Sequence, residues 1–193
     1  MNETMNETMQ NVSFTEMAHG TAEEYAFLQR HEQEYVRALP ERLIAALEQL
    51  NTSLSGYLVT RLEHSLQSAT RAHEAGESEE FVVAALLHDI GDVLAPLSHS
   101  EMAAAILRPY VSDRTHWIIK HHGLFQMYYY AHHLGGDRNA RDEYRDHPWY
   151  QDCITFCENY DQNCFDPDYN SKPLTFFKPM IDRVFAKPLT DIW

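Results

Sequence analysis

A run of apolar residues that ends in an adjacent histidine and aspartate constrains this chain most strongly. Residues 81–87 read Phe-Val-Val-Ala-Ala-Leu-Leu, and His88 and Asp89 follow directly. Such a run predicts a helix that is buried on most sides. Burying an imidazole and a carboxylate at its end is unfavourable unless another group binds them. A metal cation is the natural partner, because these two ligands together suit iron, manganese, zinc or nickel. The alternative is a core histidine that is hydrogen-bonded to the aspartate.

Further metal-binding side chains lie on or beside other predicted helices. They are His64, His99, His121 or His122, and Asp161. Together with His88 and Asp89 they supply enough donors for two ions, whereas a single zinc ion needs only about four ligands. The two oxygens of Asp89 can bridge two ions about 3.5–4 Å apart. Each histidine can also be a core residue that binds no metal.

The pattern of apolar residues predicts an all-α protein. Only seven glycines occur among the 193 residues, and few stretches alternate in the way that strands require. The predicted helices are residues 21–38, 40–50, 58–75, 78–89, 98–107, 114–134, 148–161 and 174–185, the last one bent near Pro179. Ser98 and Glu101 have the spacing of a capping box. Residues 1–20 are predicted to form a flexible tail, and residues 21–193 a single helical domain.

The charge balance restricts the class of partner. The chain has 29 acidic and 15 basic residues, a net charge of −14, which argues against nucleic acid or an anionic membrane as partner. No apolar run is long enough to span a membrane, and the N-terminus lacks the pattern of a signal peptide. The three cysteines are odd in number, so we expect free thiols and a cytoplasmic location.

These motifs resemble the HD-domain superfamily of helical metalloproteins. The matching residues are His64, His88, Asp89 and Asp161 and, at the two further positions of dinuclear members, His99 and His121. The choice of His121 over His122 follows the family's spacing from Ile118. Residues 59–67 and 84–91 are similar to the PhnZ-type oxygenases rather than to the phosphohydrolases. The resemblance implies an HD-domain helical bundle, two iron ions as a mixed-valent Fe(II)/Fe(III) pair, and O2 as co-substrate.

The resemblance also implies a substrate, a small zwitterionic organophosphonate. The implied reaction is oxidative C–P cleavage of (R)-1-hydroxy-2-(trimethylamino)ethylphosphonate to glycine betaine and phosphate. Asp92 stands where the PhnZ-type pattern has a histidine, Phe125 where it has a lysine, and Tyr57 where it has a glutamate. The first two changes favour a cationic group in the pocket. An aromatic ring in place of a carboxylate suits a quaternary ammonium, which is attracted to ring faces.

Individual roles follow from the same comparison. Asp89 is expected to be the catalytic ligand that bridges the two irons. The expected substrate-binding residues are Tyr57, Arg61, Asp92, Gln126, Tyr129 and Arg138. Arg61 is the candidate for the phosphonate end because it lies one helical turn from His64. Glu63 is expected to orient ligand histidines.

Two other functions remain open from the sequence. An HD phosphohydrolase would use a metal-bound hydroxide against a phosphomonoester or nucleotide, and a one-metal form would not need His99 and His121. A degenerate HD domain would serve as a regulatory or binding module without catalysis.

Overall fold

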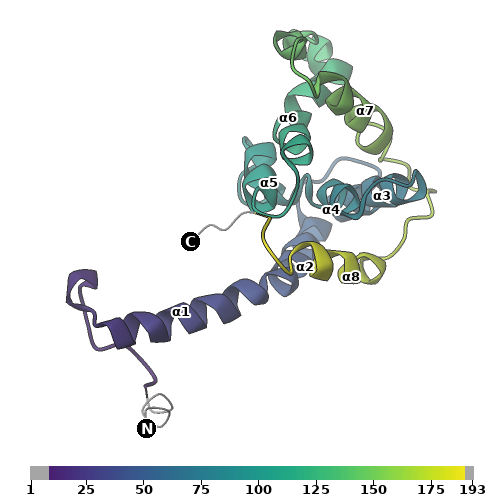
Figure 1. The fold of residues 1–193 in the computed structure, drawn as a ribbon. Helices are drawn as coiled ribbons and strands as arrows, with labels where there is room; N and C mark the ends of the chain where they lie inside the picture. The colour runs from purple at the N-terminus through teal and green to yellow at the C-terminus, as the bar shows by residue number, and fades with distance from the viewer. Residues whose placement is uncertain (1–8, 190–193) are drawn as a thin grey trace. The chain divides into compact units, whose positions relative to one another are not determined.

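The computed structural model describes residues 9–189, and every regular element in that range is helical (Figure 1), which confirms the predicted all-α class. The α-helices are α1 Ala22–Arg37, α2 Leu39–Gln49, α3 Arg61–Glu74, α4 Glu79–Leu87, α5 His99–Leu107, α6 Asp113–Tyr130, α7 Tyr150–Tyr160 and α8 Leu174–Val184. Short 3-10 helices are η1 Met17–His19, η2 Leu50–Thr52, η3 Ile90–Val93, η4 Ala131–Leu134 and η5 Ala140–Tyr144.

Residue contacts divide the chain into two units, residues 1–39 and residues 40–193. The first unit contains α1, which begins with a capping box between Thr21 and Glu24. The carboxylate of Glu24 also accepts a hydrogen bond of 2.6 Å from the main-chain N–H of Ser13. Residues 1–8 of the predicted tail lie outside the described residues, and its flexibility stays a prediction.

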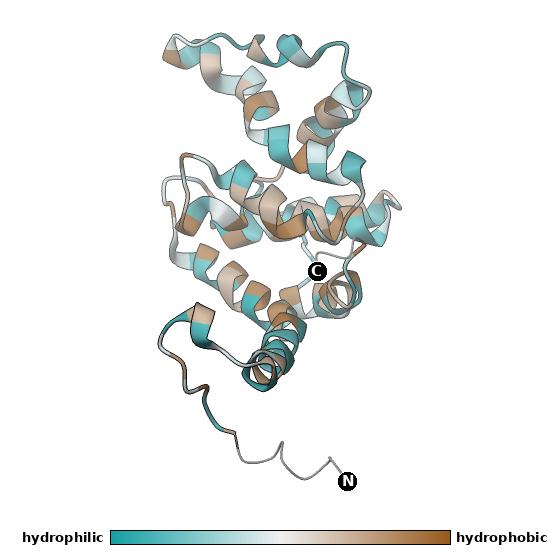
Figure 2. Cartoon of the chain, turned by 60° about the vertical axis from the view of Figure 1, so that its left-hand side comes forward, coloured by the Kyte–Doolittle hydropathy of each residue, from teal (hydrophilic) through white to brown (hydrophobic). Residues whose placement is uncertain are grey.

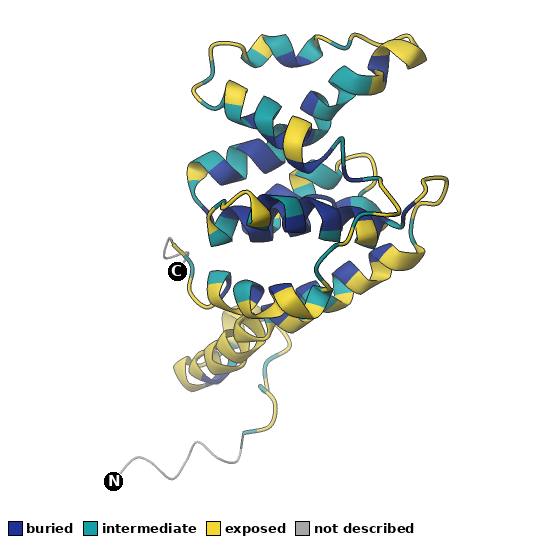
Figure 3. Ribbon diagram, turned by 90° about the vertical axis from the view of Figure 1, so that its right-hand side faces the viewer, coloured by how far each residue is buried: buried dark blue, intermediate teal, exposed yellow. Residues whose placement is uncertain are grey.

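Helix α4 is the centre of the second unit. Every one of its residues from Phe81 to Leu87 is buried, as the apolar run predicts. Figure 2 colours each residue by its hydropathy. Figure 3 shows that the buried residues are concentrated in the middle of this unit. Helix α4 packs against α3, α6 and α8. Helix α3 carries Ala69 and Ala72, both fully buried, on the part of its surface that packs in the core.

The end of α4 leads through η3 into α5, and Gly91 makes this turn possible. A Cβ atom at Gly91 would lie 2.7 Å from both the Cα and the carbonyl oxygen of His99. Only a residue without a side chain allows η3 to approach the first residue of α5 so closely. The turn therefore fixes the distance between the His-Asp motif and His99.

Some predicted boundaries are wrong. The helix expected from residue 58 starts at Arg61, after a capping box between Thr60 and Glu63 that the sequence prediction had missed. The capping box predicted at Ser98 does not form: Ser98 is the N-cap, but its side chain makes no capping hydrogen bond. Glu101 instead lies near Lys120, with 3.7 Å between carboxylate and ammonium.

Within residues 9–189, no helix combines the length and the apolarity that crossing a bilayer would need. The three cysteines are unpaired and buried: Cys153, Cys157 and Cys164.

Candidate metal centre

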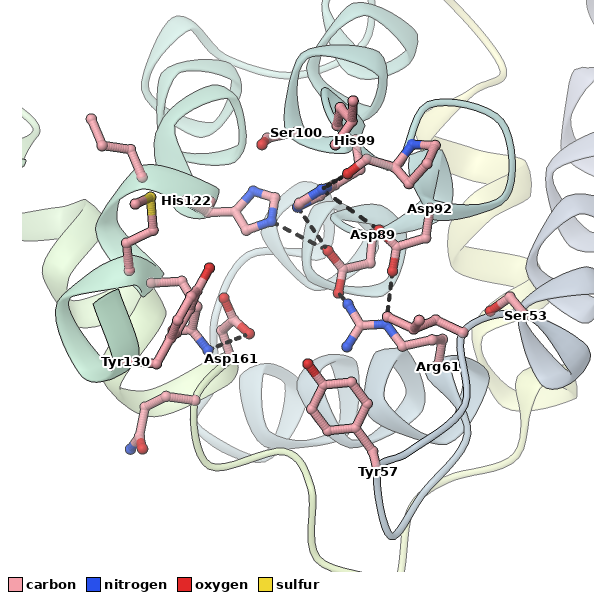
Figure 4. Close-up of a pocket in the computed structure, with 18 of the residues that line it drawn as sticks. Ser53, Tyr57, Arg61, Asp89, Asp92, His99, Ser100, His122, Tyr130 and Asp161 are labelled. Atoms are coloured by element: carbon pink, nitrogen blue, oxygen red, sulfur yellow. Dashed lines mark hydrogen bonds and ion pairs between the residues drawn. The ribbon is translucent and has the colours of Figure 1, made fainter. Parts of the chain in front are cut away.

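Five helices and the turn after α4 bring six metal-binding side chains together. His64 lies on α3, His88 caps α4, Asp89 precedes η3, His99 is the first residue of α5, His122 lies on α6 and Asp161 follows α7. Figure 4 shows His99 and His122 directed toward Asp89 from the side opposite Arg61. All but His99 are buried.

His64 and His88 face each other inside the core. Their Nε2 atoms are 3.0 Å apart. Nδ1 of His64 lies 3.0 Å from the carbonyl oxygen of Cys164, and Nδ1 of His88 lies 2.7 Å from that of Ala85. A carbonyl can only accept, so each ring donates from Nδ1 and, when neutral, carries a lone pair on Nε2. Two facing lone pairs repel each other unless a cation or a proton lies between them.

Asp89 divides the four imidazoles into two pairs. Its Oδ2 atom lies 3.2 Å from Nε2 of His64 and 3.1 Å from Nε2 of His88. Its Oδ1 atom lies 3.4 Å from Nε2 of His99 and 3.4 Å from Nε2 of His122. Each carboxylate oxygen therefore serves one pair of imidazoles, which is the arrangement required of a carboxylate that bridges two ions.

Asp161 completes the first pair. Its Oδ1 atom lies 3.4 Å from Nε2 of His64 and 3.8 Å from Nε2 of His88, and it accepts a hydrogen bond of 3.1 Å from the side-chain amide of Gln126. The ligand atoms of His64, His88 and Asp161 all lie within 4.8 Å of one another. Two imidazoles with two carboxylate oxygens make a donor set that fits a first-row transition metal.

The pKa values of these groups reflect their mutual contacts. Burial disfavours the ionised form of Asp89, but the charges of His88 and Arg61 outweigh burial and hold its pKa well below the usual range. Burial likewise disfavours protonated His64, yet its contacts with Asp161 and Asp89 raise its pKa to about 9. The protein thus surrounds this pair of imidazoles with carboxylates that stabilise positive charge.

Arg61 lies beside the carboxylates of the centre. Its Nη2 atom donates to Oδ2 of Asp89, and its Nε atom donates to Oδ2 of Asp92 over 2.7 Å. The residue is buried and lines the same cavity as Asp89, His99, His122 and Asp161. Its guanidinium is therefore the cation nearest to the bridging carboxylate among the described side chains that line the cavity.

The preference for His121 over His122 needs correction. Nδ1 of His121 bonds to the carbonyl oxygen of Trp117, and the ring stacks on the Trp117 ring with centroids 4.2 Å apart. His122 is buried and points to Asp89, with Nδ1 2.6 Å from the carbonyl oxygen of Ile119. The buried face of α6 carries Ile118, Ile119, His122 and Phe125. The apolar residue three positions after His122 was the signal that could have set the helix phase.

The change from His121 to His122 also changes which residue corresponds to the lysine of the PhnZ-type pattern. Counted from His122, the residue four positions later is Gln126 rather than Phe125. Gln126 lines the cavity, whereas Phe125 is fully buried in the core. The charge that the lysine of the PhnZ-type pattern would provide is absent in either case.

A cavity of about 960 Å³ opens beside the cluster. Five of the six expected substrate-binding residues line it: Tyr57, Arg61, Asp92, Gln126 and Tyr129. Arg138 does not, because its guanidinium lies over the ring of Tyr128 at 4.1 Å. Glu63 does not orient a ligand histidine, because its carboxylate accepts from the main-chain N–H of Thr60 at 2.6 Å. Both expectations are therefore corrected.

Two further aromatic residues line the cavity, and of these only Phe165 was missed. Phe165 stacks between His64, with centroids 4.4 Å apart, and Tyr57, with centroids 4.9 Å apart. Tyr130 lines the cavity and points across it in Figure 4. Phe165 stands in a segment without regular structure, so no periodicity marks it. Tyr130 belongs to the Tyr128–Tyr130 run, where helix phase alone decides which rings face the cavity.

Two comparisons with known proteins give a similar protein and a matching family. A segment of 36 residues is 58% identical to a protein from Leisingera caerulea named [1-hydroxy-2-(trimethylamino)ethyl]phosphonate dioxygenase (glycine-betaine-forming). The similarity covers 19% of this chain, and the chain spans 18% of the length of that relative. Residues 61–155 match the HD domain family. The matched range contains all of the proposed ligands except Asp161. The chain therefore carries an HD domain, and the match to the family spans residues 61–155.

Proposed function

We propose that this chain is a diiron oxygenase that uses O2 to cleave the C–P bond of (R)-1-hydroxy-2-(trimethylamino)ethylphosphonate, giving glycine betaine and phosphate. The observation that carries the proposal is the division of four imidazoles between the two oxygens of Asp89. A hydrolase with a single ion needs only one of these pairs. The name of the Leisingera caerulea relative supports the choice of substrate.

The ligands fall into two sets in this proposal. His64, His88 and Asp161 would hold one iron, His99 and His122 would hold the other, and Asp89 would be shared by the two sets. A mixed-valent Fe(II)/Fe(III) pair supplies the activation of O2 when it is bound. The overall change is balanced: C1 is oxidised from the hydroxymethylene to the carboxylate level, and the oxygen atoms of O2 enter the carboxylate and the phosphate.

The remaining side chains orient a zwitterion. Arg61 attracts the phosphonate and places it near Asp89, because a guanidinium donates to anionic oxygens in a fixed geometry. The rings of Tyr57, Tyr129 and Tyr130 line the cavity and attract the trimethylammonium group through cation–π contacts. Holding both ends of the substrate fixes the C1–H bond relative to the centre. The unpaired cysteines lead us to propose a reducing cytoplasm as the location.

A combined metal and turnover assay tests this function. Protein produced with iron should hold two irons per chain and should consume O2, releasing glycine betaine and phosphate. His99→Gln should abolish turnover, whereas His121→Gln should preserve it, because the His121 ring stacks on Trp117. Phosphate release from a phosphomonoester under nitrogen, with manganese and without O2 consumption on the phosphonate, would refute the oxygenase and favour an HD phosphohydrolase.

A further inference from the structure

His99 differs from the other three imidazoles in what its Nδ1 atom contacts. The other three donate to main-chain carbonyl oxygens at 3.0 Å or less. Nδ1 of His99 lies 3.5 Å from the carbonyl oxygen of Pro96 and 3.6 Å from Oδ1 of Asp92. The His99 side chain is also the most exposed of the four, at 25%. Its orientation is thus the least determined by the main chain.

Asp92 is held in a position from which its carboxylate can orient the His99 ring. It lies in η3, three residues after the bridging carboxylate, and its N–H donates to the carbonyl oxygen of Asp89 over 3.0 Å. Its side chain is 10% exposed. Oδ2 accepts from Nε of Arg61 over 2.7 Å, and Oδ1 faces His99. Oδ2 therefore has a cationic hydrogen-bond donor as its partner, and Oδ1 has the His99 ring as its neighbour.

A carboxylate is the stronger of the two acceptors near His99. A charged acceptor binds an N–H about twice as strongly as a neutral carbonyl does. At 3.6 Å the contact with Asp92 is electrostatic rather than a hydrogen bond. Donation from Nδ1 leaves the lone pair of His99 on Nε2, the atom that faces Asp89.

We propose that Asp92 is a positioning residue for the second metal position, acting through His99, and is not a contact for the cationic end of the substrate. The inference rests on the proposed dinuclear centre. A carboxylate paired with a ligand imidazole fixes its tautomer and strengthens its donor atom. Asp92 would do this at only one of the two positions, so the two ions are held unequally.

The sequence-based expectation gave Asp92 a different role, as an anionic contact for the trimethylammonium group. Oδ2 of Asp92 already accepts from Arg61 and Oδ1 faces His99, so a contact with the substrate would compete with these two groups. The two roles predict different losses. A positioning residue changes metal binding before any substrate is present, whereas a substrate contact changes only the binding of a cationic substrate.

Anaerobic titration of the apoprotein with Fe(II), without substrate, tests the proposal. In Asp92→Asn the second ion should bind about 10–100-fold more weakly, the usual effect of removing such a partner. The first ion should be affected less, because the Asp92 carboxylate pairs with Arg61 and His99 rather than with His64, His88 or Asp161. Asp92→Glu, which retains the charge, should recover part of the affinity.

Asp152→Asn is the matched control. Its Oδ2 atom accepts from Nε of Arg114 over 2.9 Å, the same type of pair as Asp92 with Arg61, but it does not line the cavity. This variant should bind both ions as the wild type does.

Several outcomes would overturn the inference. Unchanged binding of the second ion in Asp92→Asn would do so, as would equal weakening of both ions. If Asp92→Asn does not fold, Asp92→Glu carries the test: weaker binding of the second ion with near wild-type binding of the first supports the proposal, and wild-type binding of both ions would overturn it. A wild-type protein that binds two ions but does not oxidise the phosphonate would refute the proposed function and leave the role of Asp92 standing.

Discussion

Gly91→Ala tests the link between the turn after α4 and the second metal position. The new Cβ atom would lie 2.7 Å from Cα of His99, about 0.8 Å inside an ordinary carbon–carbon contact of about 3.5 Å. The obstructing atoms belong to the main chain, so no side-chain rotation relieves the overlap. The carbonyl oxygen of Gly91 accepts from the N–H of Ala95 at 2.7 Å and from that of Leu94 at 3.1 Å, which holds the turn in place. The start of α5 must therefore move.

The expected cost combines two opposing effects. Overpacking of a well-packed site costs about 1–3 kcal/mol, and replacing glycine with alanine returns about 0.4–1 kcal/mol by restricting the unfolded chain. The net loss of about 0–2.6 kcal/mol corresponds to a melting temperature lower by up to about 10 °C at about 2–4 °C per kcal/mol. A ligand displaced by more than about 0.5 Å leaves its productive geometry. We therefore expect binding of the second iron to weaken more than binding of the first.

Thermal unfolding of the apoprotein and anaerobic iron titration measure the two effects. Gly136→Ala is the matched control, because its Cβ atom would meet the carbonyl oxygen of Ala131 at an ordinary 3.4 Å. It should bind both irons as the wild type does. If Gly91→Ala retains the melting temperature within about 1 °C and binds two irons with wild-type affinity, the main chain at His99 is free to move and the reasoning fails.

Four further predictions follow from single contacts. His122→Gln should lower the iron content from two to one per chain, whereas His121→Gln should retain two; metal analysis that shows the reverse would restore the original choice. Tyr57→Leu should weaken binding of the trimethylammonium substrate about 2–30-fold, which corresponds to about 0.5–2 kcal/mol of cation–π attraction. Binding of the uncharged tert-butyl isostere should not change, and equal losses of affinity for both compounds in inhibition assays would exclude the contact. Main-chain hydrogen bonds lower the pKa of Glu24 to about 2, so this carboxylate stabilises α1 above pH 4.5 and loses that effect as the pH falls toward 2. The helicity difference between wild type and Glu24→Gln should shrink over that window in circular dichroism, and a constant difference would contradict the assignment. Burial raises the pKa of the Cys164 thiol to about 12, so a maleimide at pH 8 should label it only after unfolding, as mass spectrometry of native and denatured samples would show.

The helices and most proposed ligands could be predicted from the sequence because both depend on local pattern. The apolar run of α4 identified a buried helix, and His88 with Asp89 at its end marked the centre. The comparisons confirm the HD domain that these residues suggested. The boundary at Arg61 was missed because the Thr60 capping box was overlooked.

The remaining differences depend on contacts between distant residues. Helix α6 has apolar residues on several sides, so Ile118 alone did not decide between His121 and His122, and the position of Phe125 was not used. Arg138 was a plausible phosphonate contact by charge alone, but the ring of Tyr128 holds its guanidinium. Phe165 stacks on His64 from about 100 positions further along the chain, and no local pattern reports such a contact.

The hydrogen bonds of His88 and His122 run back along their own helices, each to a carbonyl three residues earlier. Tautomer selection at these two rings is therefore a by-product of helix formation and does not wait for a bound ion. These two ligand rings are therefore oriented before any metal ion binds. Chelation should accordingly leave the helical content nearly intact, and ions should re-enter without a slow refolding phase.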